Sequence, residues 1–211
     1  MNTAFSFFFN YLQYLIYLSI FISLCSCSGA QTRGNAKAGA GRLPQAALAV
    51  SPEAEKLYTE ALSLWRHPLA SVSAAEISTD PEKAATLLDR AIALEPGYAD
   101  AYARRGLARS ELNLREEAFD DLTTAIRLQP KPETYAYRAL ALIRSGQEKA
   151  AGRDLEYALK LDASSPTVHN YSGLLALNGD KKMEACSHFR KGCSAGDCAF
   201  LDAARAEKIC P

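Results

Sequence analysis

The feature that most constrains this 211-residue chain is a helical pattern that returns about every 34 residues. Its clearest copy, Ala99 to Pro130, has apolar and small residues at helical spacing, which predicts two amphipathic helices joined by a tight turn near Asn113. Gly106 and Ala125 lie mid-helix, where a small residue usually marks the close approach of another helix. One such hairpin cannot bury its apolar face alone, so neighbouring hairpins are needed.

The chain supplies those neighbours, because parts of the same pattern recur on both sides of this copy. The recurring segments are 80–97, 134–141, 153–164 and 168–192. A period of about 34 residues with this pattern resembles the tetratricopeptide repeat family over most of residues 51–194. The resemblance implies an all-α fold, an α-solenoid of four antiparallel helix hairpins in which the first helix of each hairpin lines a concave face.

Residues 195–211 are predicted to form a closing helix after the last repeat. Phe200, Leu201, Ala204 and Ile209 would lie on its inner side, with charged residues facing outward. A solenoid leaves its last apolar face bare, and a terminal helix with a polar outer surface covers it. We therefore expect this segment to cap the stack.

The N-terminal segment, residues 1–26, is apolar and carries no charged side chain. It is long enough to enter a membrane. Leu24, Ser26 and Cys27 resemble the lipobox of bacterial lipoprotein signal peptides, which implies lipidation of Cys27. Ser28, where Asp is absent, resembles lipoproteins sorted to the outer membrane. We expect a lipid-anchored protein of the bacterial cell envelope that faces the periplasm.

Three further features of the sequence bear on the domain organisation. Residues 27–50 are rich in Gly and Ala and poor in large apolar groups, which predicts a flexible tether. The alternative for residues 1–26 is an uncleaved transmembrane anchor, and the basic residues after it would then favour a cytoplasmic C-terminus. Residues 67–79 are an insertion in the first repeat, either a harmless surface loop or a contact surface.

Apart from Cys27, four cysteines follow the signal segment, and all four lie in the last repeat and the closing helix. In an oxidising compartment an even number of cysteines indicates disulfides. We expect Cys193–Cys198, which flank a turn, and Cys186–Cys210. A metal site built from Cys186, His188, Cys193 and Cys198 is the less favoured alternative. Free thiols in a reducing cytoplasm are the third.

Composition argues against several other functions. The chain has 24 basic and 24 acidic residues, so it carries no electrostatic footprint for nucleic acid. It has no glycine-rich phosphate loop, and its three histidines are scattered along the sequence. We therefore expect neither an enzyme nor a cofactor nor a small-molecule substrate.

Recognition of another protein or peptide is the remaining function, and the resemblance implies that it takes place in the concave groove. Tyr and Arg dominate binding hot spots. Carrying the family's groove positions onto this sequence gives a set of candidates of which we expect about half to be exposed. The candidates are Tyr58, Arg104, Tyr137, Arg144, Asn170 and Tyr171. Tyr58, Leu62 and Ala103 stand where chaperone-binding members of the family carry a carboxylate clamp, so a chaperone-tail ligand is not expected.

Overall fold

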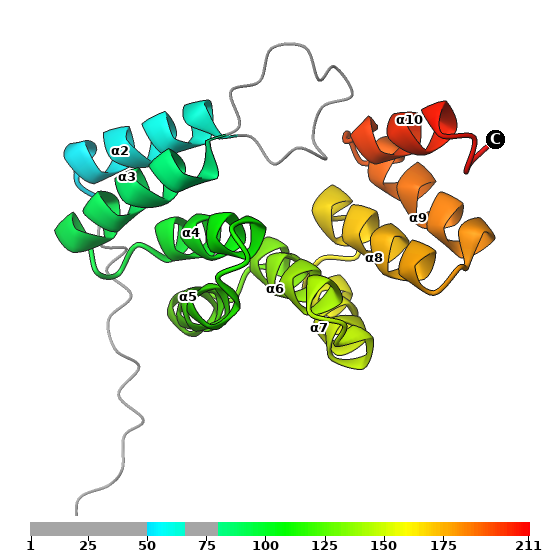
Figure 1. Cartoon of the computed structure of the whole chain (residues 1–211), viewed down its shortest axis with the longest axis horizontal. Coiled ribbons are helices and arrows are strands. Elements are labelled where there is room, and N and C mark those ends of the chain that lie inside the picture. The colour runs from blue at the N-terminus through cyan, green and yellow to red at the C-terminus, as the bar shows by residue number, and fades with distance from the viewer. Residues whose placement is uncertain (1–49, 66–79) are drawn as a thin grey trace, which may run out of the picture. The chain divides into compact units, whose positions relative to one another are not determined.

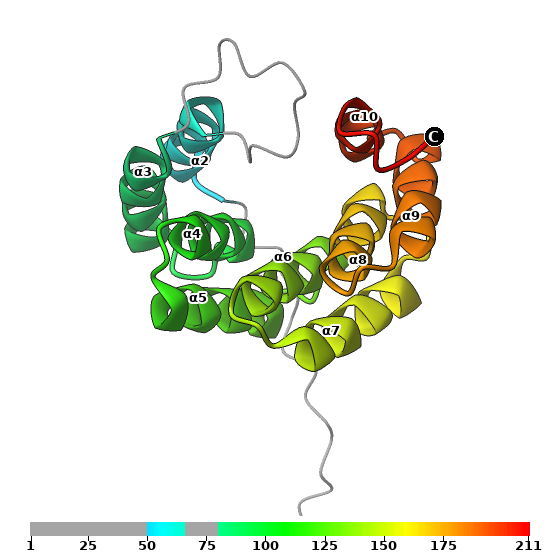
Figure 2. The ribbon, with the colours of Figure 1, turned by 45° about the vertical axis from the view of Figure 1, so that its right-hand side comes forward.

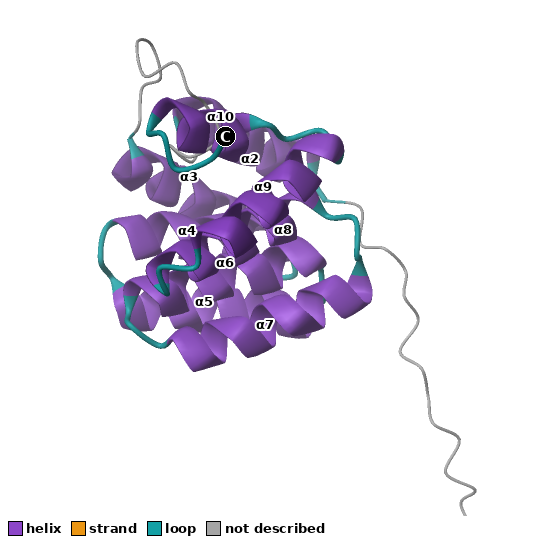
Figure 3. Ribbon diagram, turned by 90° about the vertical axis from the view of Figure 1, so that its right-hand side faces the viewer, coloured by secondary structure: helices purple, strands orange, loops and turns teal. Residues whose placement is uncertain are grey.

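The structure is a computed structural model in which residues 50–65 and 80–211 are described (Figure 1). All regular secondary structure in these two ranges is helical (Figure 3), which confirms the predicted all-α class. The predicted signal segment, the lipidated Cys27, the tether up to residue 49 and the insertion at 67–79 lie outside the described residues.

The described helices follow one another as antiparallel hairpins and end in one shorter helix. The paired helices are α2 (Pro52–Leu64) with α3 (Pro81–Leu94), α4 (Ala99–Glu111) with α5 (Arg115–Leu128), α6 (Pro132–Arg144) with α7 (Glu148–Leu161), and α8 (Pro166–Asn178) with α9 (Lys182–Ser194), before α10 (Ala199–Ala206).

Helix starts follow local sequence chemistry. The Ser51 hydroxyl accepts a hydrogen bond from the Ala54 amide (3.4 Å), and the Asp80 carboxylate accepts one from the Lys83 amide (2.9 Å). Each bond satisfies an amide that has no partner inside its helix. Proline opens α2, α3, α6 and α8, where its missing N–H costs nothing.

The turn inside each of the last three hairpins uses the left-handed backbone region. Asn113 (φ 62°), Gly146 (φ 72°) and Asp180 (φ 57°) occupy equivalent places one repeat apart. Glycine adopts this conformation without steric cost, and Asn and Asp tolerate it better than most residues. The predicted turn near Asn113 is confirmed.

Small residues allow the two helices of a hairpin to approach each other closely. A Cβ atom added at Gly106 would lie 2.7 Å from Leu122 Cγ and 3.0 Å from the Ala118 carbonyl oxygen. One added at Gly173 would lie 2.3 Å from the ring of Phe189. Larger residues would overlap these groups, which confirms the prediction that Gly106 marks a close helix contact.

Consecutive hairpins stack through the first helix of each repeat. α4 contacts α3, α6 contacts both α4 and α5, and α8 contacts both α6 and α7. Figure 2 shows α4, α6 and α8 along the inner side of the stack and α5, α7 and α9 along the outer side. The inner side is therefore the face on which the groove was predicted.

The closing helix α10 is shorter than the predicted segment 195–211. It ends at Ala206, and the chain then reverses through Lys208 (φ 56°), so that the amides of Ile209 and Cys210 both donate to the Ala204 carbonyl. Phe200 and other apolar residues of α10 are buried against the last repeat. The capping position was predicted correctly, whereas the helix length was not.

None of the described helices has both the length and the apolar character that crossing a bilayer requires.

Candidate partner-binding site

The four C-terminal cysteines form two disulfides that tie α10 to α9. Cys186 is bonded to Cys210 with their Cα atoms 5.6 Å apart, and Cys193 is bonded to Cys198 with theirs 3.9 Å apart. These are the pairs that the sequence predicts. The alternative metal site is contradicted, because its three cysteines are consumed in disulfides and no group of three or more metal ligands occurs among the described residues.

Buried ion pairs join the two helices of the second and third repeats. Arg105 on α4 donates two hydrogen bonds to Asp121 on α5 (2.8 and 2.6 Å), and Arg109 donates a third (2.8 Å). One repeat later Arg138 on α6 donates two to Asp154 on α7 (2.7 and 2.8 Å). These arginines are committed to the scaffold and cannot serve a ligand at the same time.

Arg104 differs from these arginines in both position and partners. It projects from the inner helix α4, is half-buried, and its guanidinium carbon lies 5.2 Å from the centroid of the Tyr137 ring on α6. It forms no ion pair with any carboxylate of the described residues, whereas nearby Lys131 binds Asp100 (2.7 Å). A partly desolvated cation that is not paired with a carboxylate favours an anionic ligand.

Arg104 lines a cavity of about 180 Å³, which we call the Arg104 pocket. Its lining residues are Tyr58, Asp100, Ala103, Arg104, Lys131, Glu133, Thr134 and Tyr137.

Both tyrosines of the Arg104 pocket stay neutral at physiological pH. Burial raises the pKa of the Tyr58 phenol, and the neighbouring Arg104 only partly offsets this effect. Burial likewise raises the pKa of Tyr137. Neutral phenols cannot neutralise the guanidinium, so Arg104 keeps its positive charge at the ring faces.

The comparisons with known proteins bear on the fold of the chain. No family model matches the chain. Tetratricopeptide repeat protein 13 from Homo sapiens is 32% identical over 104 residues, which is 49% of this chain and 12% of that protein. A chain in the crystal structure of the APC/C hetero-tetramer Cut9–Hcn1 shares 22% identity with a TM-score of 0.52, covering 68% of this chain and 29% of that chain. MamA from Desulfovibrio magneticus RS-1 gives a TM-score of 0.48 at 22% identity, covering 67% of this chain and 75% of that chain.

This chain has the tetratricopeptide-repeat fold. The hairpin series, the period of about 34 residues and the similarity to a named repeat protein agree on that point. The chain corresponds to only 12% of its human relative and 29% of the first structural neighbour, so their wider activities do not transfer to it.

The tetratricopeptide-repeat fold places the six predicted groove residues in different environments. Tyr58, Arg104 and Tyr137 meet in the Arg104 pocket, although Tyr137 is itself mostly buried. Arg144 is exposed but forms an ion pair with Glu111 of the preceding repeat (2.9 Å). The structure thus brings three of the six together and separates Arg144 from them.

Asn170 and Tyr171 do not line an accessible groove, contrary to the prediction. Asn170 is fully buried, and its side-chain amide donates to Asp197 (2.8 Å). The ring of Tyr171 lies between Tyr137 (6.2 Å) and Phe200 of α10 (5.9 Å). The physical reason is that α10 and the segment before it cover this end of the inner face.

Sequence reasoning missed the polar residues around Arg104. Asp100 lies in the first turn of α4, Lys131 directly precedes α6, and Glu133 and Thr134 lie at the start of α6. The short link between α5 and α6, residues 129–131, brings these residues back beside α4. Its length was visible in the sequence, but the meeting of Lys131 with Asp100 depends on how two repeats stack.

Proposed function

We propose that this chain is a protein-interaction scaffold whose Arg104 pocket binds an acidic side chain of a partner protein. The observation that carries the proposal is the half-buried Arg104 guanidinium, which contacts an aromatic ring and has no carboxylate partner among the described residues. The tetratricopeptide-repeat fold supports it by holding this residue on the inner helix of a rigid stack.

The chemistry of the pocket favours a carboxylate over other anions of similar charge. A guanidinium offers parallel N–H donors that match the two oxygens of a carboxylate. The cavity of about 180 Å³ suits one short acidic side chain. Asp100 is paired with Lys131, and Glu133 accepts a hydrogen bond from Ser165 (3.1 Å). Neither carboxylate is paired with the guanidinium of Arg104.

A random-peptide display on the full-length chain tests the proposed function. Enriched peptides should contain Asp or Glu, and Arg104→Gln should weaken their binding at least tenfold, which is about 1.4 kcal/mol. Arg127→Gln is the matched control, because Arg127 is exposed on the outer helix α5. Peptides without acidic residues, or equal binding by Arg104→Gln and the wild type, would contradict the proposal.

The location of this scaffold is a separate proposal that rests on the sequence. The apolar segment followed by Leu24, Ser26 and Cys27 supports lipidation of Cys27 and tethering to a bacterial envelope membrane, facing the periplasm. Metabolic labelling with an alkyne fatty acid tests it. Cys27→Ala should abolish the label and Cys25→Ala should keep it, whereas a mass that retains residues 1–26 would favour the uncleaved anchor.

A further inference from the structure

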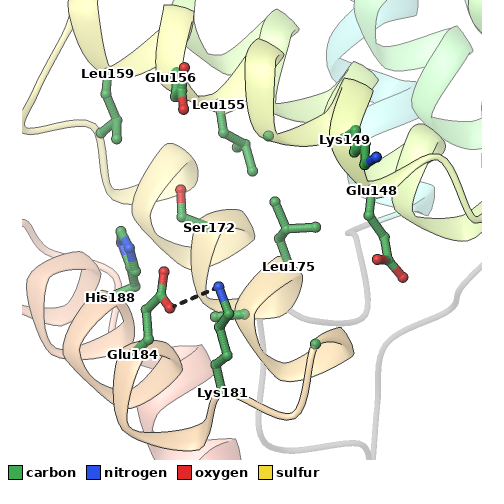
Figure 4. A pocket seen from close by; sticks show the side chains of 13 residues that line it. Glu148, Lys149, Leu155, Glu156, Leu159, Ser172, Leu175, Lys181, Glu184 and His188 are labelled. Carbon is green, nitrogen blue, oxygen red and sulfur yellow. Dashed lines mark ion pairs between the residues drawn. The ribbon is translucent and has the colours of Figure 1, made fainter.

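A second cavity lies on the outer side of the stack, between α7 and α9 with α8 as its floor (Figure 4). It has a volume of about 390 Å³ and shares no residue with the Arg104 pocket. We call it the α7–α9 cavity. Its lining residues are Glu148, Lys149, Gly152, Leu155, Glu156, Leu159, Ser172, Leu175, Ala176, Gly179, Lys181, Glu184 and His188.

The walls of this cavity differ from those of the same place one repeat earlier. Between α5 and α7 a hollow of about 340 Å³ is lined by Phe119, Leu142 and the Arg138–Asp154 ion pair. At the corresponding positions the α7–α9 cavity has Gly152, Ala176, Ser172 and His188. An aromatic ring and an ion pair are thus replaced by small residues and two neutral polar groups. The later cavity can therefore admit a large apolar group without displacing a charge.

Leucines supply most of the apolar wall. Leu155 and Leu159 on α7 and Leu175 on α8 face the space between the helices (Figure 4). The charged residues lie around them and are partly neutralised among themselves. Lys181 pairs with Glu184 (3.5 Å), and Glu148 accepts a hydrogen bond from Asn178 (2.6 Å).

The two neutral polar groups of the wall, Ser172 and His188, both offer hydrogen-bond acceptors. The Ser172 hydroxyl donates its hydrogen to the Val168 carbonyl (2.8 Å), which leaves its lone pairs for a ligand. Whether His188 can accept depends on its neighbour His169. His169 Nε2 lies 3.0 Å from the Ala163 carbonyl oxygen, which can only accept a hydrogen bond, so this nitrogen carries a hydrogen.

The tautomer of His188 follows from its contact with His169. The two Nδ1 atoms lie 3.3 Å apart. In the neutral pair His169 Nδ1 is the acceptor, because its hydrogen is on Nε2, so His188 Nδ1 must be the donor. His188 Nε2 then carries a lone pair, and no hydrogen bond within the described residues uses it.

We propose that the α7–α9 cavity is a docking site for the indole of a tryptophan on a partner protein. The indole has a large apolar body and one N–H that donates and cannot accept, which complements leucine walls with two acceptors. The tryptophan must belong to another protein, because the chain contains a single Trp and Trp65 is buried in the first repeat. Tryptophan is also among the residues most enriched at binding hot spots.

Saturation-transfer NMR with N-acetyl-tryptophanamide and the full-length chain tests the proposal. Gly152→Phe restores the ring of the preceding repeat, and its Cβ meets only Leu175 Cδ2 at 3.8 Å. We expect binding to fall at least tenfold in this variant. Gly97→Phe adds the same ring where nothing lies within 4 Å and should bind as the wild type does. Binding by Gly152→Phe equal to that of the wild type would overturn the proposal.

Two further probes need no variant and remain decisive if Gly152→Phe does not fold. The 1-methyl-tryptophan analogue lacks the N–H donor and should bind the wild type at least fivefold more weakly. N-acetyl-tyrosinamide should also bind more weakly. Equal binding by the methylated analogue, or tighter binding by the tyrosine probe, would overturn the indole assignment. Arg104→Gln should leave all of these results unchanged, which separates this site from the Arg104 pocket.

Discussion

The second and third repeats hold their paired helices together with buried arginine–aspartate pairs, whereas the last repeat uses two histidines and relies on disulfides to α10. The change occurs at equivalent positions, since His188 stands where Asp154 lies one repeat earlier and Asp121 two repeats earlier. The same hairpin geometry can therefore hold either an arginine–aspartate pair or a histidine pair between its two helices. We infer from this comparison that the small and apolar residues determine the geometry of the hairpin. The polar pair determines how the stability of each repeat depends on pH.

The largest effect should come from removing the carboxylate in the second repeat. Asp121→Ala removes the buried carboxylate that Arg105 and Arg109 share, since the Asp121 side chain is only 5% exposed. Both arginines then keep only the exposed Asp89 as a partner. We expect a loss of about 4 kcal/mol in the free energy of unfolding, typical of breaking one side of a buried ion pair. Urea denaturation followed by circular dichroism measures it.

The neighbouring Asp120→Ala provides the control for that change, because Asp120 is exposed on the same helix. It should alter stability by less than about 0.5 kcal/mol. Asp154→Ala should fall between the two, at about 2 kcal/mol, because Asp154 serves one arginine instead of two. Equal losses for Asp120→Ala and Asp121→Ala would break the proposed role of the buried pairs.

The next effect concerns the covalent bonds of the last repeat. Replacing Cys186 and Cys210 together with alanine opens a link that spans 24 residues. Because the link restricts the unfolded chain, we expect a loss of about 3 kcal/mol. The Cys193→Ala, Cys198→Ala double variant should lose about 2 kcal/mol, since its loop spans only 5 residues. Thermal unfolding under non-reducing conditions compares the two, and the reverse order would contradict the loop-length argument.

A loss similar to that of the shorter disulfide loop should follow from adding one methyl group at the end of α9. A Cβ at Gly192 would lie 2.2 Å from Oδ1 of Asn170, a fully buried side chain that also donates to Asp197. We expect Gly192→Ala to cost about 2 kcal/mol through overpacking. Gly97→Ala is the matched control, because nothing lies within 4 Å of the added atom. If Gly192→Ala is as stable as this control, the close contact at Asn170 is not a constraint.

The smallest effect should be a pH dependence confined to the last repeat. Burial, with smaller contributions from His169 and Lys191, lowers the pKa of His188 below its usual value of 6.5, and Glu184 opposes this shift. The unfolded chain then binds a proton more readily than the folded chain. Stability is therefore full above pH 6.5 and falls as the pH drops below it toward the lowered pKa.

Unfolding free energies measured at several pH values between 7.5 and 5 test this dependence. His188→Gln should flatten the curve over this window. Asp80 and Asp162 also have lowered pKa values, from an ordinary value of 3.8, so they titrate below this window and do not contribute to it. An unchanged slope in His188→Gln would show that the histidine pair does not set the response of this repeat to pH.

The sequence by itself determined the elements whose causes are local. Proline and capping residues mark the helix starts, Asn113 marks a turn, and Gly106 marks a close helix contact. These features depend on backbone preferences and on spacing within one hairpin. For the same reason the repeat period was enough to predict the stacked helical fold and the pairing of helices within each repeat.

Only the tertiary structure decided which side chains remain accessible. Asn170 and Tyr171 occupy groove positions by register, yet α10 and the segment before it cover them. His169 and His188 lie 19 residues apart in sequence, and only the packing of α8 on α9 makes them partners. Periodicity specifies the face of a helix, whereas burial and pairing depend on which distant segment lies against that face.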